Sequence, residues 1–68
     1  RLMTRYEKLV DRTIRRNLDN YAGVNLLMAS GGRYSAEQRR EFIERMSSSM
    51  RQTEAVESMI ENLNTNNN

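Results

Sequence analysis

The chain is divided by the stretch SGGRYSAEQ, which occupies residues 30–38. Gly31 and Gly32 form a glycine pair, and such a pair ends a helix well because glycine readily takes the left-handed conformation just past a helix end. Ser35 follows, with Gln38 three residues later, which is the spacing of a capping box at the start of a helix. The stretch therefore predicts a loop over residues 30–35 between two helical segments.

The segment before this loop predicts one helix from about residue 2 to residue 29. Its apolar residues recur at steps of three and four, the period of a helix with one buried face. Gly23 interrupts the pattern and predicts either a close crossing of two helices or a break after Asn20. The break is an alternative that leads to a three-helix domain. The apolar residues of this face include Met3, Tyr6, Val10, Ile14, Leu18 and Tyr21.

The segment after the loop predicts a second helix from about residue 36 to residue 63. Its apolar and small residues alternate at steps of four and three, which is the heptad seam of a coiled coil. The polar tail at residues 65–68 has no periodicity, and we expect it to fray. The seam consists of Phe42, Met46, Ser49, Thr53, Val56, Ile60 and Leu63, and Ile43 and Met50 widen it.

Two helices of nearly equal length joined by a short loop predict an antiparallel hairpin in a single domain, residues 1–64. Residues 1–16 carry six basic and two acidic side chains, whereas residues 52–68 carry three acidic side chains and no basic one. An antiparallel hairpin would place these segments side by side. Because 68 residues form only a marginal core, we expect an all-α fold in which two hairpins pair into a four-helix bundle.

The composition excludes several kinds of chemistry, since the sequence has no cysteine, histidine, proline or tryptophan. Without cysteine there is no disulfide framework and no thiolate zinc site. Without histidine the usual general base and the commonest metal ligand are missing. The glycine pair lacks the spacing of a nucleotide-binding fingerprint. We predict that the protein is not an enzyme and has no catalytic residue, no cofactor and no metal site.

The hydrophobic fraction of 37% and the charged fraction of 29% are typical of a soluble helical domain. The longest nearly apolar stretch, residues 21–29, is too short to cross a bilayer. We therefore expect no membrane span and, since cysteine is absent, a cytoplasmic location.

The leading functional prediction is a non-enzymatic interaction module, which oligomerises or binds a partner helix as an adaptor or chaperone. Methionine recurs on adaptable binding surfaces, and Met59 points away from the main seam. Together with Leu9, Leu26 and Leu27 it indicates more apolar surface than one hairpin covers. The expected interface consists of Tyr6, Val10, Ile14, Leu18, Phe42, Met46, Met50, Val56, Ile60 and Leu63.

A second hypothesis is a small dimeric domain that binds DNA or RNA. Ten of the eleven basic residues are arginine, whose guanidinium can donate two hydrogen bonds to one phosphate. The basic residues of the first predicted helix project within about 100° of arc, opposite its apolar face. Tyr34 in the loop can stack a base. The simpler interpretations are a solvated face and a tyrosine that covers the hairpin end. The expected contacts are Arg1, Arg5, Lys8, Arg12, Arg15, Arg16, Arg33 and Tyr34.

Overall fold

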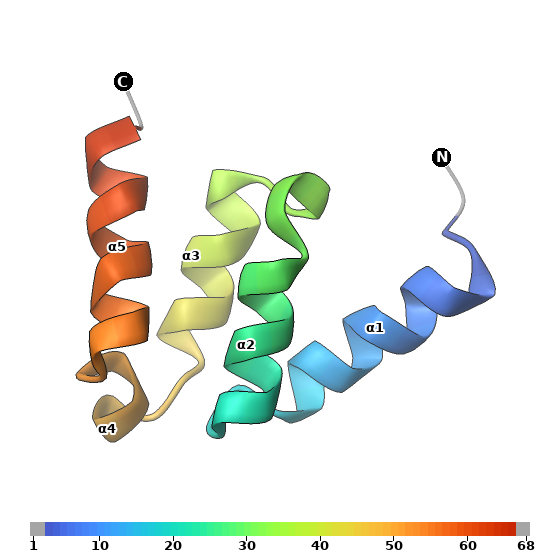
Figure 1. Ribbon diagram of the computed structural model, residues 1–68, viewed down its shortest axis with the longest axis horizontal. Helices are drawn as coiled ribbons and strands as arrows, with labels where there is room; N and C mark the ends of the chain where they lie inside the picture. Colours follow the sequence, from blue (N-terminus) through green and yellow to red (C-terminus); the bar gives the residue numbers. More distant parts are fainter. Residues whose placement is uncertain (1–2, 67–68) are drawn as a thin grey trace.

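The computed structural model describes residues 3–66, and every regular element within them is a helix, as the sequence predicts. Figure 1 shows α2, α3 and α5 lying side by side, with α1 projecting on the far side of α2 and α4 forming a single turn below α5. The elements are α1 (Arg5–Arg16), α2 (Tyr21–Ala29), the 3-10 turn η1 (Gly31–Arg33), α3 (Ala36–Glu44), α4 (Ser48–Arg51) and α5 (Glu54–Asn66).

The continuous helix expected over residues 2–29 is wrong, because the chain leaves the helix between α1 and α2. The side chain of Asn17 donates to the carbonyl of Thr13, and that of Asn20 accepts from the backbone N–H of Gly23. Short polar side chains compete with the helical backbone in this way, so they end one helix and start the next. The break agrees with the alternative prediction of a break near Gly23.

The second expected helix, residues 36–63, is divided twice, so its heptad seam is not continuous. The hydroxyl of Ser47 accepts from the backbone N–H of Met50 and caps α4, and the hydroxyl of Thr53 donates to the carbonyl of Met50. Hydroxyl side chains favour caps and turns over helix interiors. At the other end α5 continues to Asn66, so residues 65–66 of the tail are helical, and residues 67–68 lie outside the described part.

The breaks in the two expected helices are joined to each other. The carboxylate of Asp19, between α1 and α2, accepts from the backbone N–H of Ser47, between α3 and α4. Nearby, the guanidinium of Arg51 donates to the carbonyls of Ile43, Glu44 and Met46 at the end of α3. These bonds satisfy backbone groups that the helix ends leave without partners.

The basic and acidic segments do not lie side by side, contrary to the hairpin expectation. Figure 1 shows α1 and α5 on opposite sides of α2 and α3. The break after α1 turns that helix away from the rest of the bundle, so its charges cannot reach those of α5. An ion pair forms instead within α1, between Arg15 Nε and Asp11 Oδ2 at 2.8 Å.

One hydrophobic cluster joins the helices. Ile14 of α1, Val24 of α2 and Val56 of α5 are fully buried, and Phe42 of α3 is 2% exposed. Each of the four longer helices therefore contributes to a shared core. Within residues 3–66, no helix is both long and apolar enough to cross a membrane.

Candidate functional site

The structure buries most of the side chains expected to form an interface with a partner. Eight of the ten lie in the core of a single chain, and Ile60 packs partly buried against that core. Tyr6 is the exception, since 69% of it is exposed on α1. The surfaces available to a partner are therefore formed by other residues. The eight core residues are Val10, Ile14, Leu18, Phe42, Met46, Met50, Val56 and Leu63.

Tyr34 is 6% exposed and is not available to stack a base. Its hydroxyl donates to Asp11 Oδ1 at 2.7 Å, and its ring meets that of Phe42 edge-on, with 4.9 Å between the centroids. Arg15 joins the same cluster, because its guanidinium carbon lies 4.9 Å from the Phe42 centroid while its Nε donates to Asp11. Tyr34 and Arg15 were both expected to contact a nucleic acid. In the structure they hold α1 against α3.

The contacts of this cluster shift its pKa values. Partial burial raises the pKa of the Asp11 carboxyl, but hydrogen bonds from Arg15 and Tyr34 and the Arg15 charge outweigh it, so the net pKa lies below the ordinary value. The hydrogen bond to Asp11 raises the pKa of Arg15. Burial, followed by the hydrogen bond to Asp11, raises the pKa of Tyr34 to about 12. Folding therefore favours the neutral phenol and the ionised carboxyl.

Tyr34→Phe is expected to lower the free energy of unfolding by about 1 kcal/mol at neutral pH, because the hydrogen bond to Asp11 is lost. It should also flatten the alkaline loss of stability. The neutral phenol stabilises the fold fully below its unfolded pKa of 10.0, and this contribution disappears as the pH rises through about 12. For Asp11 the sign is opposite, since its contribution is present above the unfolded pKa of 3.8 and is lost as the pH falls through the lower folded value. Urea unfolding across both pH ranges measures these effects.

The exposed Tyr21 provides the control for this substitution. Tyr21→Phe should leave the free energy of unfolding at neutral pH nearly unchanged, since surface substitutions have small effects. Equal alkaline profiles for Tyr34→Phe and the wild type would contradict the role of the Tyr34 hydroxyl.

The basic face of α1 is defined here as Arg5, Lys8, Arg12 and Arg16. All four side chains are exposed, and the helical period gathers them within about 80° of arc. Among residues 3–66, no carboxylate forms an ion pair with any of the four. The face is thus a concentration of positive charge that the described part of the fold does not neutralise.

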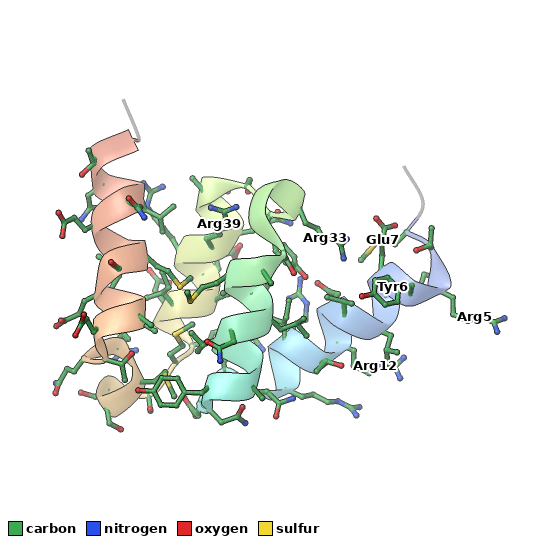
Figure 2. The ribbon with its side chains drawn as sticks, in the orientation of Figure 1. Arg5, Tyr6, Glu7, Arg12, Arg33 and Arg39 are labelled. Carbon is green, nitrogen blue, oxygen red and sulfur yellow. The ribbon has the colours of Figure 1, made fainter. Side chains whose placement is uncertain are left out.

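The remaining predicted basic contacts do not join this face. Figure 2 draws Arg12 and Arg33 on opposite sides of α1, with Arg33 toward the side of Glu7. Arg1 lies outside the described residues. Leu9 and Tyr6 are exposed, at 58% and 69%. By the helical period Leu9 borders the basic face, whereas Tyr6 lies between Leu9 and the buried Val10. Sequence periodicity located the four cations but grouped Tyr6 with the buried residues.

A second surface feature is an open groove of about 540 Å³ that α2, α3 and α5 line together. Met28, which is 47% exposed, and Met59, which is partly buried, come from its two sides, α2 and α5. Arg39 is the one charged residue among the described residues that line it. The lining consists of Leu27, Met28, Tyr34, Ala36, Arg39, Ala55, Ser58, Met59, Asn62 and Leu63.

In the sequence, Met59 indicated an apolar surface outside the core, because it points away from the predicted heptad seam. Ala55, Ser58 and Asn62 carried no such signal. They become a wall only because α5 is packed beside α3 and across from α2 (Figure 1). Within residues 3–66, no three acidic side chains gather so that they could hold a metal ion.

Comparison of the chain with protein-family models, with curated proteins and with solved structures finds no match. The functional conclusions therefore depend on the geometry of the groove and of the basic face.

Proposed function

We propose that this protein is a non-enzymatic helical interaction module whose groove binds a second copy of the chain. The observation that supports this function most directly is the groove between α2 and α5, because it is open and seven of the ten described residues that line it are apolar, two of them methionines. Methionine side chains are unbranched and flexible, so they adapt to an opposing apolar surface. Helices α2 and α5 lie apart on either side of α3 (Figure 1), which leaves room between them for helices of a second chain, as in a four-helix bundle.

The low charge of the groove permits a second copy as the occupant. Among residues 3–66, one arginine and no carboxylate line the groove, so two grooves can face each other across a twofold axis with little repulsion. Such an interface uses the same patch on both chains. In the resulting dimer α2 and α5 of each copy would form a four-helix bundle, and Met28 and Met59 of each would enter the groove of the other.

The size of the chain also favours association. A domain this short buries only about 60% of the surface of its unfolded chain, so further apolar burial in a dimer would increase its stability. A standard interface covers about 800 Å² on each partner, whereas the whole accessible surface is 5000 Å². One broad face of the molecule, whose Cα extents are 32 × 28 × 17 Å, is sufficient for such an interface.

Met28→Glu is expected to weaken the dimer about 100-fold, since twofold symmetry would bury two carboxylates, and the desolvation of each exceeds what pairing with Arg39 would return. Sedimentation equilibrium over a range of protein concentrations measures the change. Tyr21→Glu is the matched control, because Tyr21 is also exposed on α2 but does not line the groove. Circular dichroism should show both variants folded.

A wild-type chain that remains monomeric at millimolar concentration would refute the dimer. Equal weakening by Met28→Glu and Tyr21→Glu would show that the copies associate through another surface. The second hypothesis, nucleic-acid binding, included Tyr34, which lines the groove but is buried. The basic face of α1 shares no residue with the groove.

A further inference from the structure

We propose that the basic face of α1 binds a single nucleic-acid strand, with its cations on the phosphates and Tyr6 stacked on a base. This site is separate from the groove and does not depend on dimerisation. It rests on three properties of α1: what its apolar side contacts, which of its charges have partners, and where its exposed apolar side chains lie.

The apolar side of α1 is already occupied by the core. Val10 is 8% exposed and Ile14 is fully buried. The side of the helix that remains for a ligand is therefore the opposite one, and its centre is the basic face. Helices that lie in a membrane surface present an apolar centre to the lipid. A cationic centre instead suits a ligand that carries charge along its length.

The charges of the basic face are held together by the fold although they repel. Lys8 and Arg12, and Arg12 and Arg16, are four residues apart, a spacing at which like charges destabilise a helix. The helix is secured by other contacts. Thr4 and Glu7 form both bonds of a capping box at its start. Arg15 differs from the basic face, because Asp11 neutralises it. An added polyanion would remove the repulsion among the other four.

The residue types indicate phosphate and base as the chemistry of the ligand. Three of the four cations are arginines, whose planar guanidinium forks onto phosphate oxygens. From Arg5 to Arg16 the face is about 16 Å long, which corresponds to roughly five nucleotides of a stacked strand. Figure 2 draws the ring of Tyr6 over α1, with the side chain of Arg5 extending away from it. Tyr6 is 69% exposed, so its ring is a stacking platform for an unpaired base of a strand that runs along the basic face.

The test is fluorescence anisotropy with labelled oligonucleotides of deoxythymidine and of uridine, which separate DNA from RNA as the source of the strand. With four phosphates neutralised, the slope of log affinity against log salt should be about −3. The affinity should then fall about 50-fold between about 50 and about 200 mM salt. Arg12→Gln combined with Arg16→Gln should halve the slope, because two of the four cations are removed.

The control for charge is Arg33→Gln, because Arg33 is exposed but lies on the other side of α1 from Arg12 (Figure 2). It should change the slope much less than Arg12→Gln alone. The control for stacking is Tyr6→Phe, which keeps the ring. Tyr6→Ala should lower the affinity about tenfold, whereas Tyr6→Phe and Tyr21→Ala should retain it.

Three results would overturn the proposal. The first is a flat titration with both oligonucleotides at low salt. The second is tight binding to phosphatidylserine vesicles without binding to either oligonucleotide, which would assign the face to a membrane. The third is equal affinity for poly-glutamate and no loss in Tyr6→Ala, which would assign it to an acidic protein. Since Met28→Glu should retain strand binding at equal chain concentration, failure of the groove proposal and failure of this one are distinguishable.

Discussion

Gly23→Ala is expected to remove a large part of the protein's stability. A Cβ atom at this position would lie 2.0 Å from the carbonyl oxygen of Asn17 and 2.5 Å from its carbonyl carbon. Both are backbone atoms at the end of α1, so no side-chain rotation relieves the clash, and α1 and α2 must separate. Overpacking of this kind costs about 3 kcal/mol or more. A domain of this length has a total stability of roughly 3 to 10 kcal/mol.

Urea unfolding followed by circular dichroism measures the loss, and Gly32→Ala is its control. No atom lies within 4 Å of a Cβ built at Gly32, so that substitution should change the free energy of unfolding by less than about 1 kcal/mol. A Gly23→Ala variant as stable as Gly32→Ala would show that α1 and α2 do not cross as closely as described.

Phe42→Ala is expected to cost about 3 to 5 kcal/mol, the usual range for truncation of a buried aromatic ring. Phe42 is 2% exposed, and its ring contacts both Tyr34 and the guanidinium of Arg15. Its loss would leave a cavity where α1, the loop and α3 meet. The buried ring of Tyr34 and the ion pair of Arg15 would both lose a packing surface. Thermal and urea unfolding should show a folded population much smaller than that of the wild type.

Phe42→Leu distinguishes the contribution of buried volume to stability from the contribution of the ring's aromatic contacts. It keeps most of the buried apolar volume, so it should cost less than about 1.5 kcal/mol. A double-mutant cycle with Arg15→Gln should then give a coupling of roughly 0.5 to 1 kcal/mol for the cation and the ring. If Phe42→Ala were no more destabilising than Phe42→Leu, the ring would not be the centre of this contact.

Much of the local structure could be predicted from short sequence patterns. The capping box expected at Ser35 forms both of its bonds with Gln38. Gly23 was predicted to mark either a close crossing or a break, and the structure has both, with the break at residues 17–20. These features depend on side chains and backbone groups within a few residues of each other, which is why the sequence reveals them.

The candidate sites were predictable to different degrees. The four cations of the basic face share one helix, so the helical period alone brings them together. Tyr34 was misassigned because its partners, Asp11 and Phe42, come from two other helices. The groove was only suggested by Met59, because its walls belong to helices far apart in the sequence.

The sequence by itself determined that this protein is helical, where the loop after α2 lies, and that α1 carries an apolar face and a basic one. Each is a matter of spacing along the chain, and the energies involved are local. Only the tertiary structure decided that α1 and α5 lie on opposite sides of the molecule (Figure 1), that Tyr34 is buried, and that α2 and α5 enclose a groove. The physical reason lies in the break between α1 and α2 and the break between α3 and α4. Asp19 joins these breaks, because its carboxylate accepts from the backbone N–H of Ser47. The direction of the chain at each break sets which helix faces meet. The contacts that fix these directions are between residues far apart in the sequence, so no local pattern predicts them.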